Sequence, residues 1–160
     1  MDKGKYTALQ IARYFIKKGM SEKETAKLTN LKLQKILYYA QGWYLANFDT
    51  PLFEDTIEAW RYGPAIRSVY QEFKDSGSSV LDTPIEEWEI NEIDKDTKNF
   101  LDEIWKIYKQ YSGSDLITLT HNEEPYKQAR KNVKEGDSSE IEISKLSMQN
   151  FFKEKLNGTI

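Results

Sequence analysis

NLKLQKILYYAQGWYLA, residues 30–46, has the spacing of a long helix. Its apolar positions recur every three or four residues and form one predicted core stripe: Leu33, Ile36, Leu37, Ala40 and Tyr44. Asn30 is expected to cap the helix, which is predicted to run to about Asn47. Gly42 lies inside the pattern at a cost of about 1 kcal/mol relative to alanine. We therefore expect another element to pack very close to Gly42.

Four aromatic residues fall within this helix: Tyr38, Tyr39, Trp43 and Tyr44. Because a helix turns through several faces over that span, they cannot all point into one core. Some are expected at a rim, or beneath the segment Trp60-Arg61-Tyr62. Tyr and Trp beside a basic residue suit protein interfaces and also base stacking. Plain aromatic packing in the core is the competing interpretation.

The flanking sequence predicts a mainly α fold with six or seven helices. A helix from Thr7 to Lys18 begins with a capping box and ends at Gly19. Residues 20–29 are ambiguous, with Ser21 and Glu24 as caps of a short helix. Residues 57–62 alternate and are predicted to be a short strand or extended segment. Gly63-Pro64 is predicted to break the chain and start a helix, with Pro64 at its first position.

Four further helices are predicted in the second half of the chain. They begin at Asp94, Ser114, Pro125 and Ser144, and Gly113 is expected to end the first of them. The length of 160 residues favours one domain, residues 1–160, with its core at about 7–156. The fold class is therefore a compact, mainly α bundle with little strand.

Composition excludes several function classes. The chain has no cysteine, which removes disulfides, thiol nucleophiles and thiolate metal sites. It has no apolar run near the ~20 residues that span a bilayer, and its polar start lacks a signal region, so a cytoplasmic location without membrane contact is expected. No glycine-rich phosphate loop is present. No cofactor and no metal is predicted.

Charge is unevenly distributed along the chain, although the formal net charge is −3. Residues 1–40 carry nine Lys and Arg against three acids, whereas residues 82–103 carry nine acids against two lysines. The blander interpretation is that these helix faces pair with each other. The functional one is a polarised surface that steers a charged partner. The net negative charge argues against non-specific nucleic-acid binding.

His121 is the sole histidine of the chain. One histidine cannot form a two-histidine metal site, and no nucleophile signature surrounds it. We expect a structural histidine that hydrogen-bonds backbone in the turn between two short helices. A general base or a pH-sensitive contact is the alternative. The many carboxylates are expected to be solvated surface acids, so no catalytic residue is predicted.

Three ordered blocks resemble the Panacea-domain family. Residues 30–46 resemble its hallmark segment, residues 57–64 its Trp-x-Tyr-Gly-Pro block, and residues 119–126 its Leu-Thr-His-x-Glu-x-Pro-Trp block. The order and spacing agree over about residues 8–152. Tyr126 departs from the expected tryptophan but retains an aromatic ring.

The resemblance implies a phage-associated or antitoxin protein without enzymatic activity. Members are thought to neutralise unrelated toxins by direct binding, and one branch delivers its toxin to a AAA+ protease. We therefore predict a non-enzymatic antitoxin whose partner is a protein toxin encoded by an adjacent gene. Alternatives are a proteolytic adaptor, a nucleic-acid-binding regulator using the basic N-terminal helices, a homodimer closed by exposed aromatics and, weakest, a hydrolase built around His121.

Two sets of residues are predicted to matter. The first forms or supports the partner-binding surface: Trp43, Tyr44, Trp60, Arg61, Tyr62 and His121. The second maintains the family's structural motifs: Gly42, Gly63, Pro64, Thr120, Pro125 and Tyr126. The segment 157–160 is short and gives an adaptor little support as a protease-binding tail.

Overall fold

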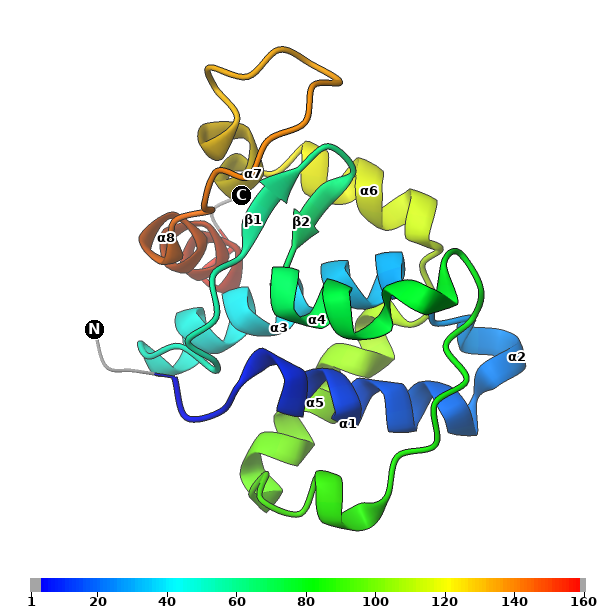
Figure 1. The fold of residues 1–160 in the computed structure, drawn as a ribbon. Coiled ribbons are helices and arrows are strands. Elements are labelled where there is room, and N and C mark those ends of the chain that lie inside the picture. The colour runs from blue at the N-terminus through cyan, green and yellow to red at the C-terminus, as the bar shows by residue number, and fades with distance from the viewer. Residues whose placement is uncertain (1–3, 159–160) are drawn as a thin grey trace.

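A computed structural model describes residues 4–158. Within that range the chain forms eight α-helices and one two-stranded hairpin, which confirms the mainly α prediction (Figure 1). The elements are α1 (Ala8–Ser21), α2 (Lys23–Ala26), α3 (Asn30–Phe48), β1 (Glu58–Trp60), β2 (Gly63–Ala65), α4 (Arg67–Phe73), α5 (Lys95–Tyr108), α6 (Gly113–His121), α7 (Glu124–Ala129) and α8 (Lys145–Leu156), with short 3₁₀ turns at Lys74–Ser76 and Glu87–Glu89. The last residues of the predicted 157–160 tail lie outside the described residues.

Helix α3 is the centre of the fold, as Figure 1 shows. It packs against α1, α4, α5, α6, α8 and β2. The predicted stripe residues Leu33, Ile36, Leu37 and Ala40 are completely buried, whereas Tyr44 is half-buried. The prediction of a single buried stripe was incomplete, because polar residues on the other faces of the helix are buried too. These are Asn30, Lys32, Gln34, Lys35 and Gln41.

The buried Gln41 fastens the chain that follows α3. Its Nε2 donates to the carbonyl oxygen of Phe53 at 2.7 Å, and its Oε1 accepts from the backbone N–H groups of Leu52 and Phe53 at 2.8 and 3.3 Å. The loop therefore gains backbone partners inside the protein, where water cannot supply them.

Other polar residues of α3 hold the start of α4 and two helix ends. Gln34 Oε1 accepts from the N–H of Ile66 at 2.7 Å, and Gln34 in turn donates to Asn30. The Lys32 amine donates to the carbonyls of Ala26 and Lys109, at the C-terminal ends of α2 and α5. Helix C-termini carry partial negative charge, so this lysine stabilises both ends.

Glycine at position 42 has the predicted close neighbour. A Cβ there would lie 2.1 Å from Cε2 of Phe152 on α8. Phe152 is completely buried and also meets the rings of Tyr38, Tyr39 and Trp43. The glycine therefore sets how closely α8 approaches α3.

Several predicted helix boundaries were wrong, although the caps at Thr7, Asp94 and Ser144 are confirmed. Gly19 does not end α1, which continues to Ser21, and its small size instead admits Leu28. Thr29, not Asn30, caps α3, since its hydroxyl accepts from the N–H of Lys32. Helix α5 stops at Tyr108, well before Gly113.

The later short helices also differ from the prediction. Gly113 opens α6, whose capping box is formed by Ser112 and Asp115 in place of the expected Ser114 cap. Pro125 lies in the first turn of α7 as expected, but α7 ends at Ala129 instead of about Asn132. Within the ambiguous residues 20–29, helix α2 covers only Lys23–Ala26, and its N-cap is Glu22, not the expected Ser21.

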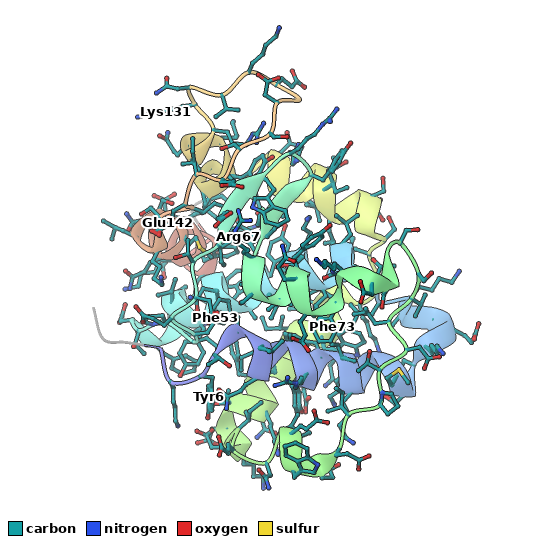
Figure 2. The ribbon with its side chains drawn as sticks, in the orientation of Figure 1. Tyr6, Phe53, Arg67, Phe73, Lys131 and Glu142 are labelled. Carbon is teal, nitrogen blue, oxygen red and sulfur yellow. The ribbon has the colours of Figure 1, made fainter. Side chains whose placement is uncertain are left out.

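The segment after residue 57 forms a hairpin. The predicted extended segment is β1, which pairs antiparallel with β2 in the register Ala59 to Pro64. Pro64 therefore lies in a strand and does not start a helix as predicted. The next helix, α4, begins only at Arg67. The chain near Glu142 adds a further extended partner to β1, with N–H to carbonyl bonds of 2.7 Å on both sides of the bridge (Figure 2).

The basic N-terminal region pairs with the acidic segment that follows α4. Five ion pairs join them: Lys5–Asp94, Arg13–Glu89, Lys17–Glu87, Lys18–Asp102 and Lys23–Asp82. The two oppositely charged stretches are therefore neighbours in the fold. This confirms the interpretation that the charged faces pair with each other.

Candidate functional site

A surface pocket of about 640 Å³ opens between the N-terminal half of α3, the hairpin, α4 and residues 138–140. Arg67, labelled in Figure 2 beside the hairpin, stands on its wall. The volume falls in the range of pockets that bury small ligands or a few side chains. Three exposed apolar side chains lie on its lining, those of Leu31, Tyr62 and Tyr70.

Lys35 projects from α3 into the base of this pocket. Its side chain belongs to the pocket lining, yet the residue is 2% exposed. The amine donates to the carbonyl oxygen of Pro64 at 3.2 Å. Burial disfavours the charged ammonium and lowers the pKa of Lys35 to about 7. Among residues 4–158 no carboxylate forms an ion pair with Lys35, so a basic group without a counter-ion lies at the base of the pocket.

Gly63 allows the hairpin to lie directly on Lys35. Its φ of +111° is a conformation that side chains with a Cβ rarely adopt. A Cβ there would lie 2.7 Å from Cε and 3.3 Å from Nζ of Lys35. The predicted structural role of Gly63 thus has two geometric reasons, its positive φ and the lack of room for a Cβ beside Lys35.

The aromatic wall is built around Trp60. Its indole N–H donates to Glu58 Oε1 at 2.7 Å, and its ring meets Tyr70 edge-on at 5.1 Å. The Arg67 guanidinium lies 5.4 Å from the centre of the same ring. Arg67 also pairs with Glu58 and Glu140 at 2.9 and 2.8 Å. Its charge is therefore already balanced by the protein.

The rim is formed by the turn between the two strands. Arg61 lies over the Tyr62 ring, with 5.3 Å between the guanidinium carbon and the ring centre. Tyr62 is 56% exposed. No ion pair joins Arg61 to a carboxylate within residues 4–158. Within the described residues, Arg61 and Lys35 are therefore the two basic side chains of the lining that form no ion pair.

The structure divides the predicted partner-binding residues. Trp60, Arg61 and Tyr62 line the pocket together, whereas Trp43 and Tyr44 lie further along α3. The Trp43 indole donates to Tyr108 Oη at 2.8 Å, and its ring packs on Phe152. Tyr44 contacts the rings of Phe48 and Phe100. These two aromatics belong to other parts of the molecule.

His121 is the last residue of α6. Its ring stacks on Tyr126 at 4.5 Å with 14° between the planes. Its Nε2 is buried with no hydrogen-bond partner, so the predicted hydrogen bond to backbone is not formed at this atom. Burial lowers the pKa of His121, and the nearby charges of Lys35 and Arg130 lower it further. The imidazole is therefore held neutral close to the pocket base.

Two further motif residues, Thr120 and Tyr126, lie next to the hairpin. Tyr126 Oη donates to the carbonyl oxygen of Trp60 at 2.5 Å. Thr120, completely buried, donates to the carbonyl of Leu116 within α6 at 2.8 Å. The hydroxyl of Tyr126 thus holds the wall residue Trp60 through its backbone carbonyl.

Sequence reasoning missed Lys35 and Glu123. Lys35 lies on the same helical face as Tyr38 and Tyr39, three and four residues later. This spacing was a signal that Lys35 is buried. Glu123 accepts hydrogen bonds from the hydroxyls of Tyr38 and Tyr39, each at 3.0 Å. Burial raises the pKa of Glu123 to about 7, which the two tyrosine bonds oppose. The position of Glu123 inside the third motif block was its signal.

Within residues 4–158, no group of three or more His, Asp or Glu side chains is placed to hold a metal ion. In the same range, no helix has the length and apolar character needed to cross a membrane.

The fold and the pocket define a mainly α protein with a cation-lined, aromatic-rimmed surface site. The chain belongs to the family described as Antitoxin SocA-like, Panacea domain, whose model matches residues 33–127. This confirms the resemblance carried by the three sequence blocks, and the matched range includes Lys35, the hairpin and His121.

A curated relative is Antitoxin SocA of Caulobacter vibrioides (strain NA1000 / CB15N). It is 27% identical over 103 residues, which are 59% of this chain and 55% of the relative. The chain therefore aligns with about half the length of that protein. No match to a solved structure was found.

Proposed function

We propose that this protein is an antitoxin that neutralises a protein toxin by direct contact, without catalysis. Its membership of the SocA-like Panacea antitoxin family is the observation that carries the proposal. We further propose that the toxin is the product of an adjacent gene, that the pair belongs to a phage or mobile element, and that residues 1–160 act in the cytoplasm as one domain.

The pocket is the proposed contact surface. Exposed Tyr62 and half-buried Trp60 next to Arg61 match the composition of interface centres. The hairpin that carries them is fixed from below by Tyr126 and by the chain near Glu142. A rigid, preformed surface loses little entropy on binding, which favours affinity.

Co-expression tests the proposal. The adjacent gene product is expressed alone and together with this protein, growth is scored, and the affinity-tagged antitoxin is then purified. Rescue of growth with a stable complex is the expected result. A neighbour that is toxic alone and equally toxic with this protein present contradicts the proposal for this chain.

A proteolytic adaptor is the second candidate, and Trp88 is the observation that favours it. Trp88 is 71% exposed and, with Arg13 and Glu89, lines a smaller cavity of about 270 Å³ apart from the pocket. An adaptor needs such a second surface for its protease. The toxin half-life, measured with wild type and with Trp88→Ala, decides between the two. A half-life that this protein does not shorten excludes the adaptor.

A further inference from the structure

The Lys35 amine lacks the partners that a buried ammonium needs. An ammonium has three N–H donors, and Lys35 uses one of them, on the carbonyl of Pro64. Elsewhere on the same helix, Lys32 is also buried, but two carbonyl oxygens accept hydrogen bonds from its amine. A buried charge without a counter-ion is costly, so an anion that reached it would be bound favourably.

The charges around the pocket select the sign of the ligand. Glu140 is a carboxylate on the lining, and it is paired with Arg67. Lys35 at the base and Arg61 at the rim remain as basic groups that have no acidic partner in the part of the chain that the structure describes. One anionic group entering between them would face positive charge on both sides.

The walls select the chemistry that accompanies the anion. Trp60 and Tyr70 form one aromatic side, and Leu31 and Tyr62 offer exposed apolar surface at the mouth. Apolar walls with few charged groups fit a short stretch of polypeptide. A nucleic-acid backbone, with its repeated phosphates, would need a row of cations that this pocket does not have.

We propose that the pocket receives an acidic side chain, Glu or Asp, that a partner protein presents beside an apolar residue, with the carboxylate paired to Lys35 and approached by Arg61. The identity of that partner as a toxin rests on the proposed function. The pairing of the carboxylate with Lys35 does not, because it follows from the pocket alone.

The first test measures binding of the adjacent gene product to variants. Lys35→Met keeps the unbranched apolar stem of the side chain and removes the amine, and Lys131→Met is the matched control on the exposed loop far from Arg67 (Figure 2). We expect Lys35→Met to weaken the complex at least roughly tenfold, since a desolvated charge pair is lost. The control should bind as wild type does. Arg61→Gln, an exposed change, provides a second variant should Lys35→Met fold poorly.

The second test needs no toxin. The full chain, labelled at the lysine ε-methylene, is titrated by NMR with the capped peptides acetyl-Phe-Glu-Leu-amide and acetyl-Phe-Gln-Leu-amide. A carboxylate beside Lys35 favours the ammonium, so the Glu peptide should raise the pKa of Lys35 from its free value of about 7. The Gln peptide should leave it unchanged. A merely structural lysine would respond to neither peptide.

The outcomes separate the two proposals. If the partner binds wild type and Lys35→Met equally, or if neither peptide moves the Lys35 titration, the carboxylate site is refuted while the antitoxin proposal stands. If the Glu peptide acts and the adjacent gene product does not bind, the site stands and the antitoxin proposal fails. A response restricted to acetyl-Phe-Leu with a free C-terminus would overturn the assignment to an acidic side chain.

Discussion

Individual polar residues in α3 join this helix to the neighbouring segments through buried hydrogen bonds. Asn30, Gln34 and Gln41 are buried, and each bonds a backbone group or a neighbouring side chain that could not reach water. Buried backbone groups need such partners. A polar residue inside an otherwise apolar helix segment can therefore mark where a loop is fastened, and does not by itself mark the exposed face.

Replacing Gln41 should be among the more destabilising single changes. Gln41→Met preserves the volume but leaves the N–H of Leu52 and the carbonyl of Phe53 without partners. Each stranded buried group costs about 1–3 kcal/mol, so we expect a loss of roughly 3 kcal/mol in the free energy of unfolding. Chemical denaturation measures it. Gln110→Met, at an exposed glutamine, is the control and should change stability by less than about 0.5 kcal/mol.

Glu123 should make stability depend on pH. Its pKa rises from the ordinary 4.5 to about 7 on folding, so between these values the folded state binds more protons than the unfolded state. Its contribution is therefore full below pH 4.5 and is lost as the pH rises through about 7. A shift of this size corresponds to a decline of order 3 kcal/mol.

The variant Glu123→Gln isolates that contribution. The amide cannot titrate, so the difference between wild type and Glu123→Gln in free energy of unfolding should change in favour of the variant as the pH rises through this window. Denaturation at a series of pH values measures this difference. The contributions of other titrating groups cancel, because both proteins contain them. Two curves that run parallel across the window would show that Glu123 does not titrate there.

At the scale of elements, the contact of α8 with α3 depends on the absence of one methyl group. Gly42→Ala adds a Cβ 2.1 Å from the Phe152 ring, which is itself enclosed by other aromatic rings. Overpacking costs about 1–3 kcal/mol, more than the ~1 kcal/mol that alanine contributes to a helix. We expect a lower melting temperature for Gly42→Ala.

A control and a compensating change make this prediction specific. Gly113→Ala, in α6, places its Cβ at an ordinary 3.4 Å from Leu31 and should not destabilise. Phe152→Leu shortens the opposing side chain, so the double variant should lose less stability than the two single changes added together. An undiminished melting temperature for Gly42→Ala alone would mean that α8 moves freely.

The hairpin shows why some elements could not be predicted. The position of Gly42 and the alternation at 57–62 are local signals. The close neighbour of Gly42 was confirmed, and the extended segment was confirmed over Glu58–Trp60, whereas residues 61–62 form the turn. Pro64 has a local signal for a helix start, but its strand conformation depends on pairing with β1 and on the chain near Glu142, about 80 residues away. Local propensity cannot show pairing at that separation.

At the scale of the whole molecule, local sequence signals were also insufficient to predict which residues share one site. Trp43 and Tyr44 were grouped with Trp60 and Tyr62 because both pairs are aromatic and belong to family blocks. Eight residues along α3 separate Trp43 from Lys35, which is about 12 Å. Composition could indicate a binding surface, but the three-dimensional position of the hairpin over Lys35 decided which aromatics share it.

Charge is also a property of the whole fold, and it gives the last prediction. Sequence alone allowed the basic N-terminal region to bind nucleic acid. In the fold, Lys32 and Lys35 are buried, and five other cations of that region are paired with acids of residues 82–103. We therefore expect no gel shift of duplex DNA even at low salt. Asp82→Asn, Glu87→Gln and Asp102→Asn combined should expose three lysines, and a weak, salt-sensitive shift should appear in that variant first. A wild-type shift that falls steeply with added salt would mean that phosphates displace the internal acids, and would restore the nucleic-acid function.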